Sequence, residues 1–107
     1  MGRQPQYWQA VADTALMQVK WTHKVLSDLA RLYEFLAAVN RQTAALTVQM
    51  LTTAPKNLLM NPRIGEQLLE FEPREVRRII VNRYEMRYEI QESTLYLLRL
   101  SHTREDR

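Results

Sequence analysis

The sequence of 107 residues contains no cysteine, only two glycines and only two histidines. Without cysteine, disulfides, thiol catalysis and thiolate metal sites are excluded, which suits a reducing compartment. No apolar run approaches the roughly 20 residues that a membrane-spanning helix needs, and the first residues lack the apolar core of a signal peptide. The sequence therefore predicts a cytoplasmic protein that does not act in a membrane.

Familiar catalytic and cofactor-binding motifs are also missing. There is no phosphate-binding glycine loop, dinucleotide fingerprint, nucleophile elbow or zinc-protease helix. No residues have metal-ligand spacing, so the sequence predicts neither a metal site nor a cofactor. Of the two histidines, His23 opens a helix and is interpreted as solvated, whereas His102 follows the last predicted strand and is the better functional candidate. One histidine without a clear partner is weak support for acid–base catalysis.

Length and composition predict a single globular domain. The hydrophobic fraction is 46% and the charged fraction 25%, both ordinary for a globular protein, and 107 residues suffice for one two-layer core. Fifteen Lys and Arg against twelve Asp and Glu give a net charge of only +3. Their distribution matters more than the sum, because five cations crowd into one short stretch: Arg74, Arg77, Arg78, Arg83 and Arg87.

That arginine-rich stretch begins a predicted meander of three β-strands, Val76–Val81, Tyr84–Ile90 and Thr94–Ser101. The links between them are two and three residues long, so neighbouring strands should form hairpins. The middle strand alternates strictly, and its apolar residues should face the core. These core residues are Tyr84, Met86, Tyr88 and Ile90, with Tyr96 of the third strand also interpreted as core; Glu85, Arg87 and Glu89 occupy the other face.

A helical hairpin is predicted before the meander. Thr22 is expected to cap a helix over His23–Val39, and Asn40 a second helix from Arg41 to about Met60. Pro55 should kink the second helix or begin a new turn. The apolar stripe of the first helix comprises Val25, Leu29, Leu32, Leu36 and Val39, broadened by Leu26, Tyr33 and Phe35.

Shorter segments complete the predicted order. Residues 17–21 alternate and predict a first strand, which we expect to pair beside the C-terminal strands. Residues 61–65 form a proline–glycine turn, and Glu66–Pro73 a connecting loop whose Leu68, Leu69 and Phe71 tuck under the sheet edge. The predicted class is α+β, ordered β-α-α-β-β-β, with the helical hairpin packed on one face of a small, mostly antiparallel sheet. Residues 1–16 are predicted to be a helical or disordered extension preceding a domain over 17–107.

Two interpretations of the arginine cluster are open. Arg77 and Arg78 are adjacent on a strand and must point to opposite faces of the sheet. In the structural interpretation the arginines pair across strands with Glu75, Glu85 and Glu89. In the functional interpretation they form a guanidinium cluster that binds phosphates or an acidic partner. Composition alone favours the structural interpretation.

Six short segments follow one another along the chain in a characteristic order: Val19-Lys20-Trp21, the Ala30/Leu32/Tyr33 helix, Asn61–Gly65, Val76–Val81, Arg83–Tyr88 and His102-Thr103-Arg104. With these segments, the chain from Met17 onward resembles the RelE/ParE superfamily of toxins from type II toxin–antitoxin systems, and in particular its ParE-like, plasmid-stabilisation branch. The resemblance implies a small bacterial toxin that a cognate antitoxin neutralises by wrapping along it. A homo-oligomer, or a hetero-oligomer with the antitoxin, is expected.

The resemblance implies two alternative activities. ParE-like members inhibit DNA gyrase, whereas RelE-like members are ribosome-dependent endoribonucleases that cut mRNA. The second helix and its following loop carry only Arg41, Lys56 and Arg63 as cations, short of the lysine-rich cluster typical of RelE. We therefore expect a gyrase inhibitor without chemistry of its own. The expected partner-binding residues are Arg77, Arg78, Arg83, Arg87, His102 and Arg104.

In the alternative, an mRNA endoribonuclease, the catalytic residues would be His102, Arg77, Arg78 and Arg87, acting as acid or base and as phosphate clamps. No general base for attack by the 2′-hydroxyl is identifiable, which weighs against this alternative. In either case, an amphipathic antitoxin segment is expected to cover the groove of the helical hairpin and the sheet edge.

Overall fold

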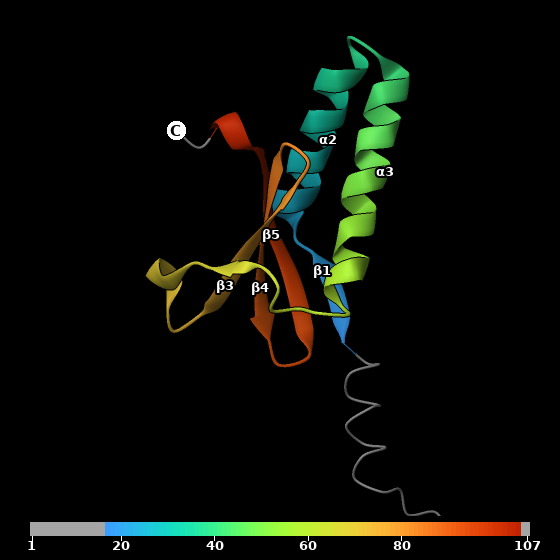
Figure 1. Ribbon diagram of the computed structural model, residues 1–107. Helices are drawn as coiled ribbons and strands as arrows, with labels where there is room; N and C mark the ends of the chain where they lie inside the picture. Colours follow the sequence, from blue (N-terminus) through green and yellow to red (C-terminus); the bar gives the residue numbers. More distant parts are fainter. Residues whose placement is uncertain (1–16, 106–107) are drawn as a thin grey trace, which may run out of the picture.

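A helical hairpin packed on one face of a five-stranded sheet makes up the fold in the computed structural model, which describes residues 17–105 (Figure 1). The helices are α2 (His23–Ala37) and α3 (Arg41–Leu58). The predicted α+β class is confirmed, with one further two-residue strand before the meander. The strands are β1 (Gln18–Trp21), β2 (Glu66–Gln67), β3 (Glu75–Val81), β4 (Tyr84–Gln91) and β5 (Thr94–His102), and short 3-10 helices are η1 (Leu69–Phe71) and η2 (Thr103–Glu105).

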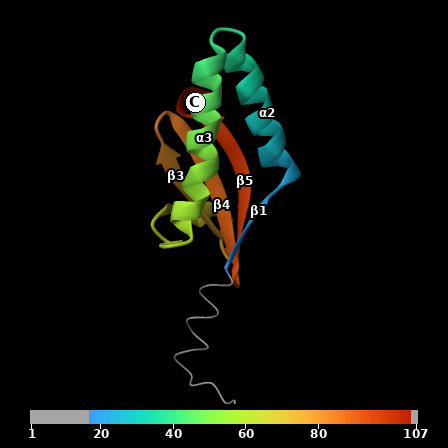
Figure 2. The ribbon, with the colours of Figure 1, turned by 90° about the vertical axis from the view of Figure 1, so that its right-hand side faces the viewer.

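The sheet has the strand order β1-β5-β4-β3-β2. Strand β1 runs parallel to β5, with Gln18 opposite Thr94 and Trp21 opposite Leu97, so the expected pairing of the first strand beside the C-terminal strands is confirmed. All other neighbours are antiparallel. Because β1 ends opposite Leu97, the last part of β5 extends beyond its parallel neighbour and lies beside α2 instead (Figure 2).

Two side chains cap the helices as predicted. The Thr22 hydroxyl accepts a hydrogen bond from the Val25 amide at 3.3 Å, and the Asn40 side chain accepts one from the Thr43 amide at 3.0 Å. Thr22 also donates to the Leu97 carbonyl at 2.6 Å, which fastens the start of α2 to β5. Each helix ends two residues before the predicted boundary. Helix α3 continues through Pro55 to Leu58, so no new helix begins at the proline.

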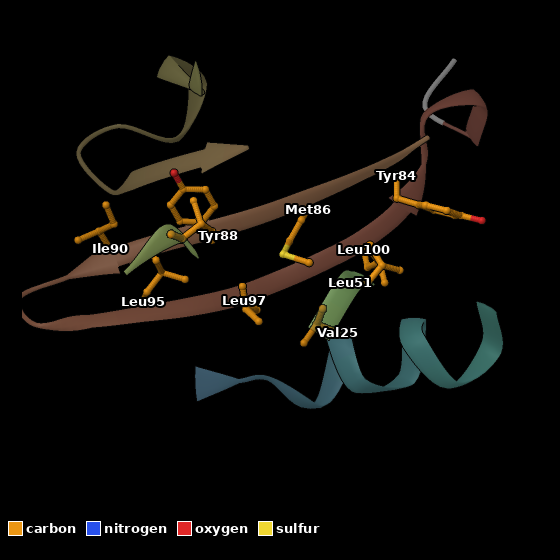
Figure 3. Packing of buried hydrophobic residues seen from close by; sticks show 10 residues of the cluster. Val25, Leu51, Tyr84, Met86, Tyr88, Ile90, Leu95, Leu97 and Leu100 are labelled. Carbon is orange, nitrogen blue, oxygen red and sulfur yellow. The ribbon is translucent and has the colours of Figure 1, made fainter. Parts of the chain in front are cut away.

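One hydrophobic core lies between the sheet and the helices (Figure 3). The four predicted residues of β4 all point into it, and none is more than 9% exposed, which confirms the predicted alternation. Helices and β5 supply the facing side chains. Burying each such side chain contributes about 1.5–3 kcal/mol. The contributors from the helices and β5 include Val25, Leu51, Leu58, Leu95, Leu97 and Leu100.

Several apolar side chains lie outside this core although the sequence pattern placed them in it. Val39 is 86% exposed and Phe35 73%, because the hairpin tip projects beyond the sheet (Figure 1). Tyr96 lies opposite Glu89 and therefore on the helix-free face, so its interpretation as core was wrong. Leu26 and Tyr33 are also substantially exposed.

The segment Glu66–Pro73 is more ordered than the predicted loop, because it contains β2 and η1. Its Leu68 is buried as expected, and its backbone amide donates to the Val76 carbonyl at 2.8 Å. Leu69 is exposed, contrary to the prediction, and Phe71 is only half-buried. The predicted N-terminal extension, residues 1–16, lies outside the described residues.

Tyr88 anchors the loop after α3 to the sheet. Its hydroxyl donates to the Pro62 carbonyl at 2.6 Å and accepts from the Gly65 amide at 3.1 Å. Burial raises the pKa of Tyr88, which therefore keeps its proton for the bond to Pro62. Gly65 has no room for a side chain, because a Cβ there would lie 2.5 Å from the Tyr88 hydroxyl and 2.7 Å from the Arg78 carbonyl oxygen.

Gly65→Ala is expected to lower the free energy of unfolding by about 1–3 kcal/mol, because the added methyl forces the loop away from β3 and β4. Urea unfolding followed by circular dichroism measures this change. Ala45→Gly, at an exposed position of α3, is a control for the change in backbone freedom alone, which costs about 1 kcal/mol in a helix. A Gly65→Ala midpoint equal to that of the unmodified protein would contradict the close contact.

Candidate functional site

The sequence-predicted site residues fall into two separate places. Arg78 and Arg87 are opposite each other in the β3–β4 register and lie on the helix-free face, while Arg77 lies on the other face. His102 ends β5 and pairs with Tyr84 of β4, whereas Arg77 of β3 pairs with Tyr88 of β4. Tyr84 and Tyr88 are four residues apart, which corresponds to about 13 Å along the strand. The structure therefore does not bring His102 together with Arg77, Arg78 and Arg87 as one catalytic cluster.

Arginine–glutamate pairs cover the helix-free face of the sheet. Arg78 bonds Glu66 at 2.9 Å and Glu85 at 3.2 Å, and Arg87 bonds the other oxygen of Glu85 at 2.9 Å. Glu85 is only 4% exposed. A buried carboxylate is stable only when cations and hydrogen-bond donors surround it. Hydrogen bonding to Glu66 raises the pKa of Arg78, which stays charged.

A second group on the same face is built around Phe71. The guanidinium groups of Arg74 and Arg87 lie over its ring, 5.9 and 5.6 Å from the centroid. Arg74 also bonds Glu89 through two nitrogens, at 2.7 and 3.2 Å. The Arg74 hydrogen bond lowers the pKa of Glu89, whose side chain is 6% exposed. Phe71 and both of its arginines thus screen a buried carboxylate from solvent.

Arg77 fixes the loop after α3 from the other side. Its guanidinium donates to the Gly65 carbonyl at 2.7 Å, the Arg63 carbonyl at 3.1 Å and the Glu75 carboxylate at 2.9 Å. Arg63 also bonds Glu75, at 2.8 Å to each oxygen, and lowers the pKa of that carboxyl. These contacts agree with the structural interpretation of the arginines. Partner binding by Arg77, Arg78 and Arg87 stays a prediction.

A groove lies between α2 and the part of β5 that extends past β1; we call it the α2–β5 groove, and its volume is about 640 Å³. Its apolar lining comes from both elements and from the start of β4. Its remaining lining is polar and mostly cationic. The apolar residues are Leu32, Phe35, Tyr84 and Leu100; the polar ones are Lys24, Asp28, Arg31, Arg99, Ser101, His102 and Arg104.

Asp28 holds the two walls of the groove together. This residue of α2 is 8% exposed, and its carboxylate accepts a hydrogen bond from the Leu100 amide of β5 at 3.0 Å. Because β1 has already ended, this bond takes the place of a strand partner at Leu100. The same carboxylate pairs with Lys24 and with Arg31, whose side chains are 60% and 67% exposed. Asp28 therefore positions two cations at the rim.

His102 and Arg104 close one end of the groove. The Nδ1 atom of His102 accepts a hydrogen bond from the Arg104 amide at 3.1 Å, which leaves Nε2 to carry the proton of the neutral ring. The rings of His102 and Tyr84 meet edge to face, with centroids 5.3 Å apart. Arg83 lies elsewhere, exposed in the β3–β4 turn. Of the six predicted partner-binding residues, the groove contains His102 and Arg104.

Sequence reasoning missed Lys24, Arg31 and Arg99. Lys24, Asp28 and Arg31 are spaced to share one helix face, a local signal that was available. Arg99 pairs with Arg87 in the β4–β5 register and also lines the groove, a position that no local pattern indicates. Among residues 17–105, no group of three or more histidine, aspartate or glutamate side chains could hold a metal ion. No described helix is long and apolar enough to cross a membrane.

Residues 19–107 match the family model described as the ParE toxin of the type II toxin–antitoxin system parDE. The chain belongs to the ParE toxin family. The ParE-like resemblance is thereby confirmed, and this ParE protein is a toxin of a type II toxin–antitoxin system. Comparison with curated proteins finds no significant match.

A solved structure, the chromosomal ParDE toxin–antitoxin system from P. aeruginosa, is similar to this ParE chain with a TM-score of 0.67. The two sequences are 21% identical, and the match covers 81% of this chain and 96% of the other. At this identity the likeness establishes a shared fold and nothing finer.

The ion pairs of Glu75 and Glu89 generate a prediction for stability against pH. Both carboxyls have a folded-state pKa below the ordinary value of 4.5. The unfolded chain therefore binds protons more readily, so this stabilisation is complete above about pH 4.5 and is lost as the pH falls through the lowered pKa values. Replacing both residues by glutamine should make the free energy of unfolding depend less steeply on pH in this acidic range.

Urea unfolding between about pH 3 and pH 6 measures the effect. Glu34→Gln, at an exposed position of α2, is the matched control and should keep the unmodified profile. If the double variant loses stability with falling pH as steeply as the unmodified protein does, these two ion pairs do not cause the acid sensitivity.

Proposed function

We propose that this toxin inhibits DNA gyrase and is neutralised by a cognate antitoxin with which it forms a hetero-oligomer. The observation that carries the proposal is the ParE family match over residues 19–107, together with the ParE-like ending His102-Thr103-Arg104. The similar solved structure is that of a ParDE toxin–antitoxin system, which supports an antitoxin as partner. We place the protein in the cytoplasm, where gyrase acts.

The geometry gives no support to the alternative, an mRNA endoribonuclease. Of its three predicted arginines, Arg78 and Arg87 share the carboxylate of Glu85 on the helix-free face. The third, Arg77, lies on the other face and bonds the Gly65 carbonyl. His102 pairs with Tyr84, whose side chain faces the core. A general acid and its clamps must reach the same phosphodiester, within hydrogen-bond distance. Inhibition by binding needs no such cluster.

The purified toxin is expected to abolish DNA supercoiling by gyrase and to leave ribosome-bound mRNA intact. Supercoiling is read on agarose gels with relaxed plasmid, and mRNA cleavage by primer extension in a reconstituted translation reaction. Preincubation with the antitoxin should restore supercoiling. Unchanged supercoiling together with cleavage of mRNA on ribosomes would replace the gyrase proposal by the endoribonuclease.

Arg104→Ala is expected to weaken gyrase inhibition about tenfold, the effect of losing about 1.4 kcal/mol of binding, while the melting temperature stays unchanged. The residue is exposed and its backbone, not its side chain, holds the bond to His102. Arg41→Ala, at the exposed start of α3, is the matched control. Equal inhibition by the Arg104 variant and the control would remove Arg104 from the partner-binding residues.

A further inference from the structure

The outward face of α3 carries almost no charge. The residues that point away from the core recur at steps of three and four, and all are exposed: Gln42, Leu46, Gln49, Thr53, Lys56 and, just beyond the helix end, Met60. Only Lys56 among them is charged. The solvent-facing side of a helix is ordinarily rich in charged residues, and α2 of the same hairpin follows this rule with Lys24, Arg31 and Glu34 exposed. The missing charge on α3 therefore calls for an explanation other than contact with water.

The part of the chain around α3 also lacks acidic residues and exposes apolar ones. Residues 35–65 contain no aspartate or glutamate. The same run contains five of the nine large hydrophobic residues that are exposed in the described chain: Phe35, Val39, Leu46, Met60 and Ile64. Two of these, Leu46 and Met60, lie on the outward face of α3 and are 59% and 87% exposed. Exposed apolar side chains with few charges among them are typical of the centre of a protein–protein interface.

The shape of this surface indicates the kind of partner that fits it. Helix α3 lies in front of the sheet in Figure 2, and no other described element covers its outward side. The hairpin to which it belongs projects beyond the sheet (Figure 1). A convex, projecting helix cannot enclose a ligand, so the partner must supply the cleft. This favours a large folded protein over a short peptide.

The β3–β4 turn connects α3 to a residue that is already proposed to bind gyrase. The side-chain nitrogen of Asn82 lies 4.0 Å from the sulfur of Met50 in α3, so the neighbouring Arg83 is beside this helix. The Arg83 carbonyl accepts a hydrogen bond from the Thr103 amide at 2.9 Å, which places the turn next to Arg104 as well. The outward face of α3 is therefore continuous, through Arg83, with Arg104.

The cations at the margin give this surface its sign. Among residues 17–105, no ion pair involves Lys56, Arg83 or Arg104, so none of them has to leave a carboxylate in order to bind a partner. Acidic groups of a partner would complement them. A second copy of this chain, docked through the same surface, would instead bring like charges together. Nucleic acid, with a phosphate about every 3.4 Å along each strand, would place its charges against the uncharged centre of the face.

We propose that the outward face of α3 docks in an apolar cleft of gyrase whose margin carries acidic residues. Leu46 and Met60 contact the apolar part of the cleft, Gln49 lies near the centre of the contact, and Lys56 and Arg83 pair with carboxylates at its margin. This inference rests on the proposed inhibition of gyrase. It specifies which surface of the toxin makes the contact and the chemistry of the gyrase surface that receives it.

Two double variants of the full-length toxin test the charge of the contact. Gln49→Glu/Lys56→Glu places acids on the outward face of α3, and Gln18→Glu/Lys20→Glu makes the same changes at exposed positions of β1. Inhibition of supercoiling is titrated with gyrase holoenzyme, and binding is measured by surface plasmon resonance on immobilised gyrase. At low salt the α3 variant is expected to bind and inhibit at least about tenfold more weakly, because acids then face acids. The β1 variant should match the unmodified toxin.

Leu46→Ser tests the apolar part of the contact. It should weaken binding to gyrase about tenfold at every salt concentration, whereas the loss in the charge variant should shrink as salt increases. Leu69→Ser in η1 is the matched control, because Leu69 is 64% exposed and Leu46 59%. Both leucines are largely outside the core, so the melting temperatures of both variants should stay close to that of the unmodified toxin.

The unmodified toxin in the same assays separates failure of this inference from failure of the proposed function. If it inhibits gyrase and the α3 variants inhibit equally well, the function stands and the α3 surface is wrong. A loss in the β1 and Leu69 controls as large as in the α3 variants also overturns the surface. If Leu46→Ser abolishes only self-association, seen by analytical ultracentrifugation, the face binds a second copy instead. An unmodified toxin that neither binds nor inhibits gyrase removes the function, and the inference with it.

Discussion

Two carboxylates on the helix-free face of the central strand constrain the rest of this structure. Glu85 and Glu89 are each 4% exposed, although helices cover only the opposite face of β4. An unpaired carboxylate at such positions would cost several kcal/mol, so arginines must lie over them. Arg78 and Arg87 do so for Glu85, and Arg74 does so for Glu89. The arginine-rich stretch is thus first of all the cover of a sheet that lacks a second helical layer.

This requirement changes how the arginines can act. A guanidinium that holds a buried carboxylate cannot leave it for a ligand without exposing that carboxylate to an unfavourable environment. The cost of recruiting these side chains would reduce the affinity for any partner. Partner recognition is therefore easier where cations are held in position but are not needed to neutralise a buried carboxylate. Asp28 provides such support, because it is bonded to the Leu100 amide and leaves Lys24 and Arg31 largely exposed.

Local patterns in the sequence predicted most of the fold. The alternation of β4 and the caps Thr22 and Asn40 depend on neighbouring residues only, and the predicted elements match the structure within two residues. The face to which each side chain of β5 points was harder to predict, because a bulge between the partners of Arg87 and Tyr88 shifts the alternation. Leu97 and Leu100 both face the core across it, a spacing of three that no strand pattern predicts. The exposure of Phe35 likewise depends on how far the hairpin tip extends past the sheet.

The α2–β5 groove was not predictable either, because it also depends on how distant elements pack together. Its charged residues show why the density of charge along the sequence was a poor guide to the site. Of the cations that crowd together along the chain, Arg77 and Arg87 pair with a glutamate of their own strand, and Arg74 and Arg78 pair with glutamates of neighbouring strands. Lys24 and Arg31, whose side chains are largely exposed, lie on α2, and Arg99, which also lines the groove, lies about 70 residues further along the chain on β5. Only the packing of α2 beside the end of β5 brings these together. A dense run of arginines along a strand can therefore indicate a sheet face whose buried carboxylates need cationic partners. In this fold, the α2–β5 groove forms where elements distant in the sequence meet beside the part of β5 that extends past β1.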